Sequence, residues 1–127
     1  MNPEVLAKAG VYPIERQAAR LDGWQLTLAP RATLIPSDGR SVHGVLGRLT
    51  HPDIDKLYTR DWFGFGVYLP EAVMVTNAAA NKLAAMCYIA WETAGGKPAP
   101  EYVEKMVSAA REFSFPEDYV RHIQSFV

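Results

Sequence analysis

The sequence predicts an α+β fold in which strands come first and helices last. Between residues 18 and 91, short apolar segments alternate with glycine, proline and polar turns, which is typical of strands. After residue 99, apolar residues recur at the three- and four-residue spacing of amphipathic helices. Because the strands and helices are segregated along the chain, the order argues against alternating βαβ units.

Composition narrows the class of protein. The chain has 127 residues, so we expect one domain over residues 1–127. Apolar residues make up 49%, charged residues 21%, and the net charge is −1. This balance lacks the basic footprint of a nucleic-acid binder and the polybasic run of a membrane-surface protein. No transmembrane run or signal peptide is visible, so we expect a soluble, cytoplasmic protein with no nucleic-acid or membrane partner.

The first half of the chain predicts a helix and then strands. Asn2, Pro3 and Gly10 suit the cap, first turn and exit of a short helix. Residues 18–30 predict a strand in which Gly23 indicates a bulge or a close approach of another backbone segment. Residues 31–37 predict a short extended piece that Pro36 ends, and residues 41–49 predict a further strand.

A helix and a hairpin are expected next. Thr50 is placed to cap a helix, with Asp53 three residues later. Residues 67–77 and 82–91 predict two strands joined by the small polar loop 77–81. Pro70 indicates that the first of them is an edge strand near its start.

The last third predicts two helices. Residues 100–113 have an apolar face with charged residues elsewhere. Ser114 followed by Glu117 three residues later predicts a capping box at the start of the second helix.

Few residues suggest chemistry. The three histidines are dispersed over different elements, so we expect no metal site and no cofactor. Cys87 lies in an apolar strand and is expected to pack in the core. Asp61 is followed by aromatic residues that could desolvate its carboxyl and raise its pKa toward the range for proton transfer. These residues alone leave open whether Asp61 is a catalytic acid or an ordinary loop residue.

Several segments together resemble one family. "LDGWQLTL", "VHGVLGRLTHPDIDKLY" and "AAMCYIAW" are similar, in this order, to strands and a short helix of the γ-glutamylcyclotransferase-like proteins, which include the AIG2-like proteins. The segment "PAPEYVEKMVSAAREFSFPEDYVRHI" resembles the family pattern P-S-x-x-Y, a helix with a small-residue pair, then L-P-x-x-Y. The matching positions are Pro98, Tyr102, Ala109, Ala110, Pro116 and Tyr119.

The resemblance implies a small mixed β-barrel with short helices outside it and two C-terminal helices. Family enzymes bind a γ-glutamyl group at the barrel mouth, where the substrate's α-amine attacks the γ-carbonyl to give 5-oxoproline and a released amine. One glutamate serves as base and acid, and Asp61 occupies its position here. Tyr68 and Tyr88 are candidates to line the substrate pocket, whereas Tyr102 and Tyr119 are expected to pack the helices onto the barrel.

Two departures from the family pattern bear on whether this chain has the family's activity. Aspartate is shorter than glutamate by one methylene, and the family's Y-G-S loop is missing, so we expect the chain to begin just past the first strand. A missing strand would leave an edge that a homodimer could cover. The alternative to the enzyme is therefore a catalytically impaired or non-enzymatic module of the same fold, which binds a small molecule or dimerises.

Overall fold

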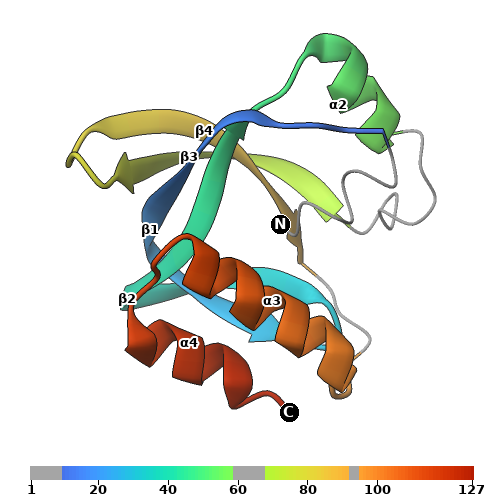
Figure 1. Cartoon of the computed structure of the whole chain (residues 1–127), viewed down its shortest axis with the longest axis vertical. Helices are drawn as coiled ribbons and strands as arrows, with labels where there is room; N and C mark the ends of the chain where they lie inside the picture. Colours follow the sequence, from blue (N-terminus) through green and yellow to red (C-terminus); the bar gives the residue numbers. More distant parts are fainter. Residues whose placement is uncertain (1–9, 59–67, 92–94) are drawn as a thin grey trace.

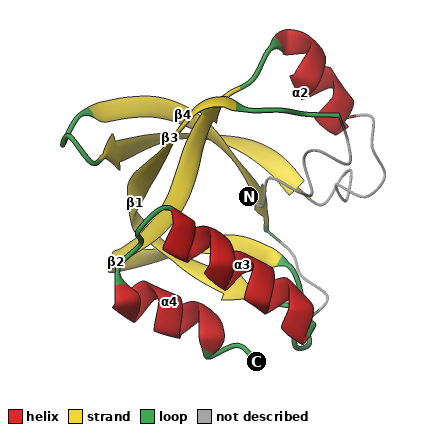
Figure 2. Ribbon diagram, viewed as in Figure 1, coloured by secondary structure: helices red, strands yellow, loops and turns green. Residues whose placement is uncertain are grey.

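The computed structural model describes residues 10–58, 68–91 and 95–127 as an antiparallel sheet with helices packed against it (Figure 1). The expected N-terminal helix falls on residues outside these ranges. The described elements are β1 (Ile14–Leu28), β2 (Ala32–Arg48), α2 (His51–Tyr58), β3 (Tyr68–Asn77), β4 (Lys82–Ala90), α3 (Pro100–Glu112) and α4 (Glu117–Gln124). The sheet order is β2-β1-β3-β4, and α3 and α4 lie together at the opposite end of the molecule from α2 (Figure 2).

The β1–β2 hairpin is longer than the sequence predicted. The register shifts at Gly23, as expected, and Gly23 has a φ of 86°, but the extra residues of the bulge lie on β2, where residues 37–40 face this single residue of β1. β2 runs through Pro36 as one strand of 17 residues, but its pairing with β1 is interrupted there, as expected: Pro36 lies opposite Trp24, and the next pair is Ser41 with Asp22. β2 is an edge of the described sheet, and an edge strand tolerates a residue that has no N–H to donate.

The next two predictions are confirmed. The Thr50 hydroxyl accepts a hydrogen bond from the Asp53 backbone N–H at 3.3 Å, at the start of α2. β3 and β4 form the expected hairpin, and the Asn77 side chain accepts from the N–H groups of Ala79 and Asn81 within its loop. β3 pairs with β1 only at its far end, so near Pro70 the described strand has β4 as its one neighbour.

The link between α3 and α4 differs from the predicted capping box. The cap position of α4 is Pro116, which makes no side-chain cap bond. Ser114 instead lies in the left-handed region, with a φ of 56°, and ends α3. Its N–H bonds the Arg111 carbonyl, and the Phe115 N–H bonds the Ala110 carbonyl at 2.9 Å. This pair of bonds is a Schellman motif, so Ser114 terminates one helix and does not start the next.

The core lies between the sheet and the two C-terminal helices. It comprises Leu21, Leu26, Leu28, Leu34, Val42, Val75, Ile89, Val103, Val107, Ala110, Val120 and Ile123. The α+β class is thus confirmed. The described strands are all antiparallel and form an open sheet, so the expected barrel is not closed by backbone ladders. Within the described ranges, no helix is both long and apolar enough to cross a membrane.

Candidate functional site

The principal candidate, Asp61, falls in the segment 59–67, outside the described residues. The described chain frames that segment on both sides, with α2 before it and Tyr68, the first residue of β3, after it. The other two candidates, Tyr68 and Tyr88, lie in β3 and β4.

Tyr68 is half-buried and engages the backbone of β2. Its hydroxyl donates to the Ala32 carbonyl at 2.8 Å. The Ala32 N–H in turn donates to the hydroxyl of Tyr102, on α3, at 3.0 Å. Burial, followed by the proximity of Tyr102, raises the pKa of Tyr68, so its phenol stays protonated. The backbone of Ala32 thus joins β3 to α3. Tyr102 packs its helix onto the sheet, as predicted.

A threonine joins the two edges of the open sheet. The Thr33 hydroxyl, on β2, donates to the Ala90 carbonyl at 2.9 Å and accepts from the Ala90 N–H at 2.8 Å. Both residues are buried, and Ala90 is the last residue of β4. Because β2 and β4 are the outer strands, this side chain brings the sheet nearly into a ring. Sequence reasoning missed Thr33, since a threonine in a strand is unremarkable.

Tyr88 and its neighbour Cys87 point to opposite faces of β4. Cys87 packs against the core, as predicted, and burial raises the pKa of its thiol. Successive strand residues alternate in direction, so partly buried Tyr88 shares the other face with Met86 and lies opposite Pro70.

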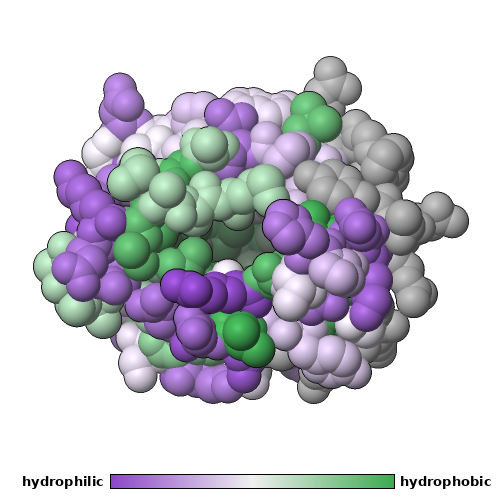
Figure 3. Space-filling view, turned by 90° about the horizontal axis from the view of Figure 1, so that it is seen from above, coloured by the Kyte–Doolittle hydropathy of each residue, from purple (hydrophilic) through white to green (hydrophobic). Residues whose placement is uncertain are grey.

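The molecule is hollowed at the end away from α3 and α4. Seen from above, a depression opens at its centre, with apolar residues along one side of its rim and hydrophilic residues along the other (Figure 3). Several half-buried apolar side chains of the sheet pack against the core without being fully covered by it. They are Ala19, Leu46, Val73, Leu83, Ala85 and Cys87. A concave, mostly apolar surface of this kind is typical of a small-molecule site.

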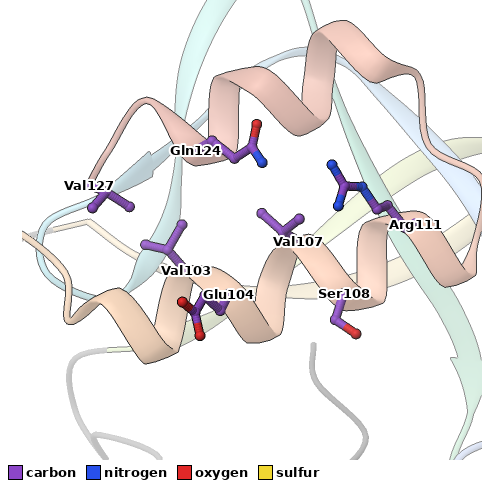
Figure 4. A pocket seen from close by; sticks show the side chains of 7 residues that line it. All are labelled: Val103, Glu104, Val107, Ser108, Arg111, Gln124 and Val127. Atoms are coloured by element: carbon purple, nitrogen blue, oxygen red, sulfur yellow. The ribbon is translucent and has the colours of Figure 1, made fainter.

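A separate groove of about 530 Å³ lies between α3 and α4. Val103 and Val107 point into it from α3, and Gln124 lies across from them on α4 (Figure 4). Arg111 also lines it and is 3.8 Å from the Glu117 carboxylate. Neither Tyr68 nor Tyr88 is among the described residues that line this groove.

α4 docks on the sheet through aromatic contacts. The Tyr119 ring meets the His43 ring edge-on, with centroids 5.0 Å apart. Burial raises the pKa of Tyr119 to about 12, so it is no candidate for a base near neutral pH. The His122 Nε2 atom lies 3.2 Å from the Leu26 carbonyl of β1. Tyr119 therefore packs α4 onto the sheet, as the sequence predicted.

Comparisons with known proteins agree on one family. Residues 41–123 match the AIG2-like family. A mouse γ-glutamylcyclotransferase is 23% identical over 94 residues, which cover 74% of this chain and 50% of the mouse protein. The chain thus spans about half the length of the curated relative it matches.

Solved structures share the fold. A γ-glutamyl cyclotransferase structure superposes with a TM-score of 0.76 at 19% identity, covering 89% of this chain and 76% of the other. YkqA from Bacillus subtilis superposes with a TM-score of 0.81 at 23% identity, covering 98% of this chain and 51% of that protein. At such identities the likeness establishes the fold alone.

Proposed function

The chain belongs to the AIG2-like family, and from this we propose that it is a γ-glutamylcyclotransferase-like protein that cyclises a γ-glutamyl amine or peptide. The products would be 5-oxoproline and the released amine. The observation that carries the proposal is the family match over residues 41–123, a span that includes Asp61. The mouse relative named γ-glutamylcyclotransferase supports the reaction class.

Asp61 is the proposed base and acid. The reaction forms a bond between the substrate's α-nitrogen and its γ-carbonyl carbon, and it breaks the bond from that carbon to the leaving nitrogen. The α-ammonium must first lose a proton, and the leaving nitrogen must gain one. One carboxyl group can perform both transfers in sequence. Tyr68 and Tyr88 are proposed to line the substrate pocket, and Tyr88 would do so from the face of β4 opposite to Cys87.

Because aspartate stands in place of glutamate, we expect the enzyme to be slow. The shorter side chain withdraws the carboxyl by ~1.5 Å when the backbone does not compensate. A misplacement of about 1 Å can cost on the order of a hundredfold in rate.

The test is release of 5-oxoproline from γ-glutamyl-alanine, measured by chromatography. Asp61→Asn keeps the shape of the side chain and removes its basicity, so we expect activity to fall by at least about a hundredfold. Asp61→Glu restores the missing methylene, so we expect a gain of up to about a hundredfold. Equal activity of the wild type and Asp61→Asn would remove Asp61 from the mechanism.

The shorter acid also favours a second candidate, a module that binds a γ-glutamyl compound without cyclising it or that dimerises through its open edge. Titration with γ-glutamyl-alanine, followed by calorimetry, separates binding from catalysis. Saturable binding without 5-oxoproline release, in both the wild type and Asp61→Glu, would favour the binding module. Release of 5-oxoproline by the wild type would exclude a module that only binds, whereas release by Asp61→Glu alone would identify the wild type as catalytically impaired.

A further inference from the structure

A lysine near the C-terminal end of α2 joins this helix to the segment that leads into β1. The Lys56 ammonium, in the last turn of α2, donates to the Gly10 carbonyl at 3.1 Å. It also lies 3.5 Å from the Asp53 carboxylate, one turn earlier in the same helix. Gly10 and Lys56 are 46 positions apart in the sequence, so the bond to the carbonyl is a tertiary contact. Figure 1 shows the segment before β1 passing beside α2.

The segment that carries this carbonyl is itself fixed to the rest of the molecule. Val11 is fully buried, with 0% of its surface exposed. Pro13 packs closely against β2, because a Cβ added at Gly47 would lie 2.9 Å from the Pro13 Cβ. The Gly10 carbonyl therefore sits on a firm support, and the ammonium that binds it holds the helix in place.

α2 needs such a support because its described side chains bury little surface. Among them, Asp53 and Ile54 are partly buried and the others are exposed. None of these described side chains belongs to the core or packs against it. The start of α2 is held by the Thr50 cap and by the short link from β2. Lys56 supplies the corresponding contact in the last turn.

We infer that Lys56 is a positioning residue for the proposed reaction, because its bond to the Gly10 carbonyl fixes the end of the helix that precedes Asp61. The inference rests on the proposed role of Asp61 as base and acid. α2 ends at Tyr58, three residues before Asp61. Three residues span at most about 11 Å, so the reach of the carboxyl depends on where the helix ends. A misplacement of about 1 Å can cost on the order of a hundredfold in rate.

Lys56→Met tests this role, since methionine keeps an unbranched side chain and removes the charged donor. We expect kcat for release of 5-oxoproline from γ-glutamyl-alanine to fall by about tenfold or more. KM should change by less than about twofold, because the proposed pocket tyrosines lie on β3 and β4 and not on α2. Lys56→Arg keeps a cation with N–H donors, so it should restore kcat to within about threefold of the wild type. A lysine that merely packed against its neighbours would be replaced as well by methionine as by arginine.

Hydrogen exchange of α2, followed by mass spectrometry without substrate, tests the anchor independently of activity. Lys56→Met should speed exchange in the last turn of α2 by about tenfold or more, while exchange in β1 and β2 stays unchanged. Asp53→Asn removes the ion pair within the helix and leaves the bond to Gly10, so both readouts should change by less than about threefold. Lys82→Met is the matched control, because Lys82 is an exposed lysine at the start of β4 and should leave both readouts unchanged.

The outcomes separate this inference from the proposed function. Unchanged exchange in Lys56→Met would overturn the anchor, and an unchanged kcat beside an active wild type would overturn the positioning role. Effects of Asp53→Asn as large as those of Lys56→Met would also overturn it, because the ion pair within the helix would then suffice. Absence of 5-oxoproline release by both the wild type and Asp61→Glu would overturn the proposed function, and the role of Lys56 with it, whatever the exchange shows.

Discussion

At the scale of single residues, His43 connects stability to pH. Its ring packs against Phe115 and Tyr119 of the C-terminal segment. Burial, followed by the charge of Arg20, lowers the pKa of His43 below its ordinary value of 6.5, and Asp22 opposes this shift. The folded protein thus favours the neutral ring, whereas the unfolded chain takes up a proton near pH 6.5. Stability is complete above that pH and is lost as the pH falls toward the folded pKa.

We expect the free energy of unfolding to fall between about pH 7.5 and about pH 5, and His43→Phe to reduce this fall. Phenylalanine keeps a ring against Phe115 and Tyr119 but cannot bind a proton. Urea denaturation of both proteins at each pH measures the difference between their free energies of unfolding. The carboxylates contribute equally to the pH dependence of the two proteins, so their contribution cancels in this difference. An equally steep pH dependence in the variant would show that His43 does not contribute.

Thr33 provides a second residue-scale prediction. Thr33→Val has nearly the same shape but removes the hydroxyl that serves both backbone groups of buried Ala90. Because two buried polar groups lose their partner, we expect a loss of about 2–4 kcal/mol in the free energy of unfolding. Thr33→Ser keeps the hydroxyl and should cost only about 1 kcal/mol, for the lost methyl group. Urea denaturation compares them; similar losses in the two variants would indicate that packing, not hydrogen bonding, matters at this position.

At the scale of elements, the end of α3 contains a serine in a conformation that favours glycine. Ser114 has a φ of 56° within the Schellman motif. Left-handed backbone costs a residue with a Cβ roughly 1–2 kcal/mol, and glycine avoids this cost but orders at a greater entropic penalty. We expect Ser114→Gly to stabilise the protein by about 0.5–1 kcal/mol, measured by thermal and urea unfolding. Ser114→Val should destabilise it; if glycine destabilises it too, the side chain of Ser114 has a role that the backbone does not reveal.

Local patterns predicted most elements because their signals lie close together in sequence. Thr50 caps the helix it precedes, and Gly23 marks the place where the register between β1 and β2 shifts. Pro36 interrupts the pairing with β1 but does not end the strand, because β2 lies at the sheet edge, where a missing N–H is tolerated. Ser114 could either start or end a helix, and the tertiary path of the chain decides between them.

At the scale of the whole molecule, the features that position the site are long-range and could not be predicted. The Thr33–Ala90 contact joins residues 57 positions apart, and Tyr68 reaches Ala32 across 36 positions. Neither tyrosine nor threonine carries a sequence signal for its partner. The order of strands before helices nevertheless predicted the α+β class, and the family resemblance led to the packing role of Tyr102 and Tyr119, because it summarises such contacts for a known fold.

Sheet curvature and helix docking should be coupled through Ala32. Its carbonyl accepts from Tyr68 of β3, and its N–H donates to Tyr102 of α3. Each tyrosine hydroxyl holds the backbone at Ala32, and it thereby positions the backbone group that the other tyrosine binds. We expect Tyr68→Phe and Tyr102→Phe to cost about 0.5–3 kcal/mol each, because each leaves a part-buried backbone group without its partner.

The double variant tests the coupling. Once one tyrosine hydroxyl is lost, the segment at Ala32 is already less constrained, so removing the second should cost less than it does alone. We expect an interaction energy of at least about 0.5 kcal/mol from urea denaturation of the four proteins in the cycle. Tyr88→Phe combined with Tyr102→Phe is the control pair, since Tyr88 lies on the outward face of β4, opposite Pro70. Strict additivity in the Tyr68–Tyr102 cycle would mean that the sheet holds Ala32 rigidly by itself and that α3 docks on an already fixed scaffold.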